Sequence, residues 1–252
     1  MEDANSVDMV TVSSTSDDTL PRYPRRRLSP VPQHRKPRFL SATPVGPCRR
    51  PPSRTKGYHD NLDLHEIPLK PISFEGKKAK EAIAQPLQEV VMAGCSTDKS
   101  AVNVLFAIRR PGCGQCREHG MQLAEICQSN PNVNLMGVIK DTVGIHQSIF
   151  EFYSNYFTFP LYKDEGWNLY HTIGNKKLNL FKMVSKAPAL EVRYAKKGIR
   201  NIPFGGDLFT QGGVLIFDKQ GKLRFVYYET YGKPLDMDAL QWAIEQANQT
   251  EP

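Results

Sequence analysis

Residues 109–118, RRPGCGQCRE, stand between an apolar run and an amphipathic run, and this arrangement decides the fold. The preceding run, residues 102–108 (VNVLFAI), is typical of a strand covered on both faces. The following run carries apolar residues at helical spacing, namely Met121, Leu123, Ala124, Ile126 and Cys127. We therefore predict a strand over residues 102–109, a tight turn, and a helix over residues 114–129 with two cysteines at its entrance.

Two cysteines at a helix entrance favour thiol chemistry. The unpaired N–H groups and the dipole of a helix N-terminus stabilise a thiolate anion. Two intervening residues let the sulfurs of Cys113 and Cys116 meet across one helical turn, which suits a reversible disulfide. Gly112 and Gly114 keep the surroundings of Cys113 free of bulk. Positive charge close to the pair comes from Arg109, Arg110 and Arg117.

The cysteine pair has two other interpretations, half of a zinc site or an inert structural pair. A zinc site takes four ligands, often as a second C-x-x-C or an H-x3-5-H pair. The sequence has neither, because Cys48, Cys95 and Cys127 occur singly and the 6 histidines lack ligand spacing. We expect no metal. The sequence also has no nucleotide or flavin signature, so no organic cofactor is expected.

Composition divides the 252 residues into a basic tail, residues 1–60, and a folded domain, residues 61–252. Residues 20–56 contain 11 Lys or Arg and no Asp or Glu, and 9 of the 19 prolines precede residue 60. Such a segment has too little apolar surface to offset its ordering entropy, so we expect it to be disordered. Two P-x-x-P-x-R matches in the tail suggest binding to an SH3-type domain, and Ser29 suggests a phosphorylation site. We favour a solvated tail over both hypotheses.

Targeting signals are scarce in the sequence. The tail has no apolar h-region, and its early acidic residues do not fit a transit peptide. No apolar run reaches the roughly 20 residues that span a membrane. Unpatterned cysteines favour a reducing compartment, so we expect a cytoplasmic protein and leave organelle import open.

The rest of the domain alternates helices with strands. Helices are predicted over residues 77–92, 145–157, 165–173 and 236–247. Strands are predicted over residues 134–140, 159–162, 214–218 and 223–228, the last two forming a hairpin. Pro86 either kinks the first helix or starts a second one, Ile83 faces inward, and Gly94 ends it. The pattern indicates an α/β three-layer sandwich with helices on both sides of a mixed sheet.

Residues 176–204 interleave basic and apolar side chains. We interpret them as an insertion of one or two helices packed on the edge of the domain. A basic amphipathic segment also suits an anionic membrane surface, and this weaker reading stays open.

The element order, with C-x-x-C between the first core strand and its helix, resembles the thioredoxin fold. Over residues 80–248 the chain more closely resembles the peroxiredoxin-like 2 branch of the alkyl hydroperoxide reductase/thiol-specific antioxidant (AhpC/TSA) superfamily. Two motifs carry the resemblance: residues 109–118, and Gly205-Gly206-Asp207 followed by Gln211-Gly212-Gly213. Thioredoxins have a cis-proline where Gln211-Gly212-Gly213 stands. We expect Gly212 and Gly213 to let the backbone approach the cysteine loop closely.

The resemblance implies an antioxidant, a thiol peroxidase or thiol-disulfide oxidoreductase, acting on a peroxide or disulfide. One thiolate attacks and becomes a sulfenic acid, the other closes the disulfide, and an external thiol such as thioredoxin or glutathione reduces it. Analogy with thioredoxin makes Cys113 the nucleophile. Analogy with the T-x-x-C of peroxiredoxins makes it Cys116, with Cys113 replacing the threonine. The sequence leaves both open.

Neighbouring residues have two interpretations each. Arg109, Arg110 and Arg117 either lower a thiol pKa and hold peroxide oxygens or are solvated charges beside a turn. Glu118 either orients an arginine or suits the first helical turn. His119 is expected to point to solvent, and Cys127 into the core.

Two other functional classes compete with the redox one. The first is an interaction or regulatory module with the basic tail as docking arm and sensor or relic cysteines. The second is a metal-binding scaffold. No nucleic-acid partner is expected, because the tail has few aromatic residues for stacking. The oligomeric state stays open.

Overall fold

The computed structural model describes residues 55–57, 64–94, 101–140, 145–174, 177–202, 207 and 209–249. Apart from residues 55–57, the predicted tail lies outside this part of the chain, together with its proline motifs, Ser29 and Cys48. Cys95, Gly205 and Gly206 also lie outside it.

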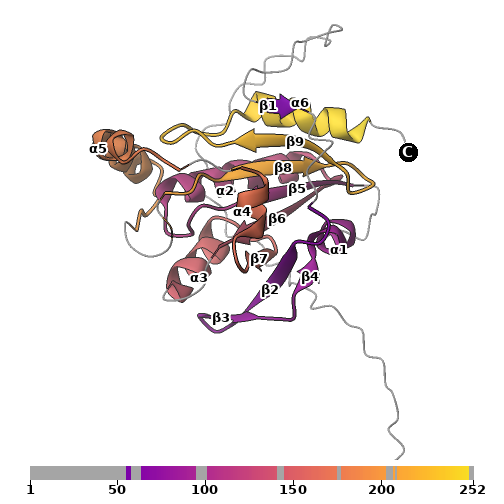
Figure 1. Cartoon of the computed structure of the whole chain (residues 1–252). Helices are drawn as coiled ribbons and strands as arrows, with labels where there is room; N and C mark the ends of the chain where they lie inside the picture. Colours follow the sequence, from indigo (N-terminus) through magenta and orange to yellow (C-terminus); the bar gives the residue numbers. More distant parts are fainter. Residues whose placement is uncertain are drawn as a thin grey trace, which may run out of the picture. The chain divides into compact units, whose positions relative to one another are not determined.

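One mixed sheet holds the nine strands of the described residues (Figure 1). They are β1 (Thr55–Gly57), β2 (Pro68–Glu75), β3 (Lys78–Glu81), β4 (Gln85–Pro86), β5 (Val102–Ala107), β6 (Val133–Ile139), β7 (Leu161–Asp164), β8 (Gly213–Phe217) and β9 (Leu223–Tyr228). Their order is β1-β9-β8-β5-β6-β7-β2-β3, and β4 pairs with β2. β5 runs parallel to β6 and antiparallel to β8, so the strand that leads to the cysteines lies in the middle of the sheet.

The helices connect these strands in a thioredoxin-like way. They are α1 (Leu87–Ala93), α2 (Gly114–Ser129), α3 (His146–Asn155), α4 (Asn168–Thr172), α5 (Leu180–Lys196) and α6 (Met237–Asn248). The core follows the chain order β5-α2-β6-α3-β8-β9-α6, with the spatial order β6-β5-β8-β9. Two parallel strands joined through a helix therefore sit beside an antiparallel hairpin with a helix after it. The predicted fold class is confirmed.

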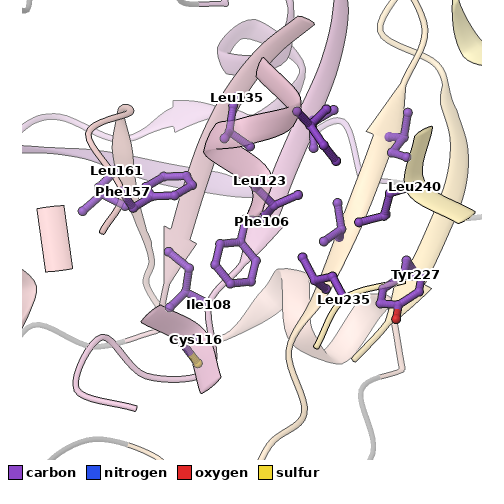
Figure 2. Close-up of a cluster of buried hydrophobic side chains, with 14 of the residues drawn as sticks. Phe106, Ile108, Cys116, Leu123, Leu135, Phe157, Leu161, Tyr227, Leu235 and Leu240 are labelled. Carbon is purple, nitrogen blue, oxygen red and sulfur yellow. The ribbon is translucent and has the colours of Figure 1, made fainter. Parts of the chain in front are cut away.

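Helices cover both faces of the sheet. On one face, residues of α2, α3 and α6 form a cluster with Val104, Phe106 and Ile108. On the other face, α1 and α4 pack with Leu105 and Ala107. This alternation arises because successive strand side chains point to opposite faces. All six residues of β5 are buried, as predicted for a central strand. Figure 2 shows the sulfur-bearing side chain of Cys116 at the edge of the first cluster, beside Ile108.

The predicted helix over residues 77–92 is wrong in its first half. Residues 78–81 form β3, which pairs with β2. Gly76 has a φ of 58°, which an L side chain rarely adopts, and it allows the turn between the two strands. Ile83 is 89% exposed and does not face the core. The second alternative for Pro86 is confirmed, because α1 begins directly after it and ends at Gly94.

The other predicted elements are confirmed with small shifts. The helix over 114–129 and both hairpin strands have the predicted bounds to within one residue. Asp236 caps α6, since its side chain accepts a hydrogen bond from the Ala239 N–H at 3.2 Å. β7 begins two residues later than predicted, after Pro160. None of the described helices combines the length and apolar character needed to cross a membrane.

Candidate redox site

The cysteine pair lies at the N-terminus of α2, just after the central strand. Cys113 is the residue before the helix, and Cys116 is in its first turn. Both are reduced in the structure; 7% of Cys113 is exposed and none of Cys116. The Gly114 N–H, which has no partner within the helix, donates a hydrogen bond to Asn201 Oδ1 at 2.8 Å. The pair is therefore an enclosed dithiol and not a surface one.

Arg109 is the arginine that reaches the sulfur. Its Nη2 donates to Cys113 Sγ at 2.6 Å. The hydrogen bond from Cys116 and the charge of Arg109 together hold the pKa of the Cys113 thiol well below its usual range, although burial opposes them. Burial raises the pKa of Cys116 well above its usual range, and its bond to Cys113 adds to this. The site thus favours a thiolate at Cys113 and a thiol at Cys116.

Behind Arg109 lies a buried carboxylate that the sequence analysis did not single out. Glu229, at the end of β9, places Oε1 3.6 Å from Arg109 Nε, and the same oxygen accepts the Gly212 N–H at 3.0 Å. Burial alone would raise its pKa, but Arg109, His119 and Gly212 lower it to about 2. Glu229 is therefore ionised at neutral pH.

His119 does not point to solvent, and that prediction is wrong. Its ring is fully buried, with Nε2 3.0 Å from the Lys233 carbonyl oxygen and Nδ1 3.5 Å from Glu229 Oε2. The ring turns inward because the first turns of α2 are covered on this side by Phe106 and by the segment after β9. The structure thus places the His119 ring beside Glu229, the carboxylate that pairs with Arg109.

Arg117 makes its hydrogen bonds to groups other than the sulfurs. Arg117 is fully buried and donates to the carbonyl oxygens of Pro111 (3.0 Å) and Arg200 (2.9 Å). It also donates to Glu151 at 3.2 Å. Arg110 is buried, and its carbonyl accepts the Cys113 N–H at 3.1 Å. Arg117 therefore ties the cysteine loop to its neighbours.

Glu118 joins α2 to the basic insertion. Its carboxylate pairs with Arg193 of α5 and, at 2.7 Å, with Lys197. Tyr194 of the same helix is buried against Gly114, where an added Cβ would lie 2.5 Å from the ring. The insertion is thus packed over the start of α2, next to the cysteines, with its inward face formed by Leu190, Tyr194 and Ile199.

The second motif, which includes Gly212 and Gly213, lies on the side of the site that is formed by the sheet. A Cβ on Gly212 would lie 2.6 Å from the Ala107 carbonyl oxygen, at the end of β5, and one on Gly213 would lie 2.6 Å from that of Tyr227. The close approach is therefore to the strands on either side and not to the cysteine loop itself. Asp207 pairs with Lys140, at the end of β6, at 2.5 Å.

One sequence signal was available for Glu229. It directly follows the predicted strand 223–228, and Gly212 directly precedes β8. Pairing of the hairpin strands places these ends side by side, so the glycine motif and the glutamate meet. Among the described residues, no group of three or more His, Cys, Asp or Glu side chains has the arrangement of a metal site.

Fold and site together define a class: thioredoxin-like redox proteins with a dithiol at a helix N-terminus. Residues 122–231 match the family model described as AhpC/TSA antioxidant enzyme; the match begins after the two cysteines. The chain is 30% identical over 155 residues to prostamide/prostaglandin F synthase of Aquarana catesbeiana, covering 58% of this chain and 75% of the relative. It is 30% identical over 147 residues to the protein of that name from Danio rerio, covering 56% and 71%.

Peroxiredoxin Q of Xanthomonas campestris is a similar solved structure, with a TM-score of 0.44 and 14% identity, covering 71% of this chain and 91% of that chain. The sequence matches show the family. The chain belongs to the peroxiredoxin-like AhpC/TSA family of redox proteins, as the two sequence motifs indicated.

Proposed function

We propose that this protein is a thiol-dependent oxidoreductase that reduces peroxides, with Cys113 as nucleophile and Cys116 as its resolving partner. The contact between Arg109 Nη2 and Cys113 Sγ, at 2.6 Å, carries the proposal. A cation against one of two buried sulfurs makes that sulfur the thiolate, and the thiolate is the reactive form. We further propose that it works in the cytoplasm, where a reducing environment recycles it.

The reaction balances with an external thiol as reductant. The Cys113 thiolate attacks one peroxide oxygen, the O–O bond breaks, and the departing oxygen takes a proton to leave as an alcohol or water. Cys113 is then a sulfenic acid. The Cys116 thiol attacks its sulfur, water leaves, and the disulfide forms. Two thiol equivalents, from a thioredoxin or glutathione, restore both cysteines.

Substrate choice is part of the proposal. The relatives are named for the synthesis of prostamide and prostaglandin F, which are organic products, so we propose to test organic as well as inorganic peroxides. Disulfides are the second substrate class, because the same dithiol exchanges with them.

The test is mass spectrometry of differentially alkylated full-length protein over a time course after one equivalent of peroxide. We expect loss of both thiols at Cys113 and Cys116 as one intramolecular disulfide. Cys116→Ser should accumulate a sulfenic acid at Cys113, and Cys113→Ser should stay reduced. Cys127→Ser is the matched control, since Cys127 lies further along α2. Unchanged peroxide consumption in both single variants of the pair contradicts the proposal and favours the interaction-module hypothesis.

A further inference from the structure

Four buried polar groups form a row that begins at the proposed nucleophile. The Cys113 sulfur accepts from Arg109 Nη2 at 2.6 Å, and Arg109 Nε lies 3.6 Å from Glu229 Oε1. Glu229 Oε2 in turn lies 3.5 Å from His119 Nδ1. Each side chain is at most 7% exposed. The row joins three separate parts of the chain: the β5–α2 loop, the end of β9, and α2.

The far end of the row is incompletely hydrogen-bonded. Among the described residues, Glu229 Oε2 and His119 Nδ1 are buried and find no partner within hydrogen-bond geometry, although they face each other at 3.5 Å. His119 Nε2 lies 3.0 Å from a carbonyl oxygen, to which it can only donate. With Nε2 directed to this carbonyl, Nδ1 is the ring nitrogen that faces the Glu229 carboxylate.

Stability alone does not explain this arrangement. A buried ion pair gives up the hydration of both partners, and apolar residues of similar volume often serve as well or better. The Gly212 N–H already donates a hydrogen bond to one carboxylate oxygen of Glu229. The distinguishing feature of the row is that its first member is the Cys113 sulfur.

We propose that Glu229 and His119 are positioning residues that hold the Arg109 guanidinium against the Cys113 sulfur. This inference rests on the peroxide-reducing function proposed above. Glu229 fixes Arg109 from behind, and His119 fixes Glu229 through its second oxygen. Arg109 then stays beside the sulfur when Cys113 is oxidised and its negative charge is gone.

Other charged and titratable groups face this row and enter its pH dependence. On α2 the Cys116 thiol lies beside Cys113, and on the segment after β9 the Tyr231 ring centre is 5.3 Å from the Arg109 guanidinium. Lys140 at the end of β6 and Arg110 in the cysteine loop add positive charge. Gln115 Nε2 lies 3.5 Å from the His119 ring and is uncharged.

The experiment measures the rate of Cys113 alkylation against pH in full-length variants, read by peptide mass spectrometry. Glu229→Ala should raise the apparent pKa of Cys113 by about one unit or more, because Arg109 loses its anchor. The reaction with hydrogen peroxide at pH 7 should slow as the thiolate fraction falls, by about tenfold if the new pKa is near 8. Glu229→Gln should restore both values, because its amide oxygen still accepts from the Gly212 N–H and stays beside the Arg109 guanidinium. His119→Phe should shift the pKa in the same direction as Glu229→Ala, by less.

Two rival explanations for Glu229 predict different outcomes. A purely electrostatic role for Glu229 predicts a lower Cys113 pKa in both the Ala and the Gln variants, since removing a negative charge favours the thiolate. A purely structural role lowers the midpoint of thermal unfolding and leaves the Cys113 pKa unchanged. Either result overturns the inference, and Glu229→Gln and His119→Phe decide it if Glu229→Ala does not fold.

Matched controls come from the surface. Glu125→Ala on α2 and His146→Phe on α3 replace exposed residues of the same types and should leave the alkylation profile unchanged. The proposed function fails separately: it fails if Cys113→Ser still consumes peroxide. If Cys113→Ser is inactive and Glu229→Ala behaves as wild type, only the positioning inference fails.

Discussion

Replacing Arg109 by methionine should raise the pKa of the Cys113 thiol and slow its reaction with peroxide. Arg109 is buried, and its Nη2 donates to the sulfur at 2.6 Å. Methionine has a similar length and can occupy the same space without the charge. The substitution therefore removes the cation from the thiolate with little loss of packing.

The size of the effect follows from the geometry. Unit charges 2.6 Å apart attract by about 6 kcal/mol at an effective dielectric constant near 20, which is an upper bound. Both groups lose hydration on burial, so an opposite charge at contact shifts a pKa by about 1–3 units, or about 1.4–4 kcal/mol. A thiol returned to the ordinary value near 8.5 is only about 3% ionised at pH 7. We expect the rate constant with hydrogen peroxide at pH 7 to fall by about 30-fold.

Alkylation of Cys113 across pH 4–10, followed by peptide mass spectrometry, gives the pKa, and stopped-flow kinetics give the peroxide rate. Arg109→Lys should recover part of the shift, because it restores a positive charge without the planar fork. Arg200→Met is the matched control: that side chain is 69% exposed and pairs with Glu151. An unchanged alkylation midpoint in Arg109→Met would refute the assignment of Arg109 as the activating cation.

Three further predictions concern stability and resolution. Since the pKa of Glu229 is lowered to about 2, its contribution to stability is present above about pH 4.3 and is lost as the pH falls toward 2. In urea unfolding, the wild type should lose about 3 kcal/mol of unfolding free energy across this pH range. Glu229→Gln should not show this loss. Gly114→Ala should destabilise the fold by about 1–3 kcal/mol in the same assay, because the new Cβ meets the Tyr194 ring at 2.5 Å. In a Tyr194→Ala background, Gly114→Ala should cost less stability, because this clash is gone. Cys116→Ser should leave the first oxidation of Cys113 intact but block disulfide formation, so that excess peroxide drives Cys113 to the irreversible sulfinic acid; intact mass distinguishes the products.

The elements that the sequence predicted well are those with an unambiguous local pattern. Residues 102–108 are apolar throughout most of their length, and the glycines and proline after them end the strand. The hairpin and α6 have turn residues and an aspartate cap at the expected places. In each case the local preference and the tertiary environment agree.

The failures occur where the tertiary environment decides. Residues 78–81 have good helix formers, and the turn at Gly76 and the pairing with β2 make them a strand. The spacing puts His119 on α2, but the side on which it lies depends on Phe106 and on Lys233, 114 residues further along. Glu229 is a single acid among aromatic residues, and its role depends on Arg109, 120 positions earlier. Interactions of this kind follow from packing and not from local pattern.

The difference between the two cysteines has a simple physical origin. Both sulfurs are buried, and burial disfavours a thiolate, so two adjacent thiols cannot both ionise. The hydrogen bond from Cys116 and the charge of Arg109, which lies against Cys113, together decide which one does. Lys140, another cation whose charge acts on Cys116, is already paired with Asp207 at 2.5 Å. The placement of charge thus supports Cys113 as nucleophile and leaves Cys116 as the neutral thiol that can donate a hydrogen bond to it and later close the disulfide.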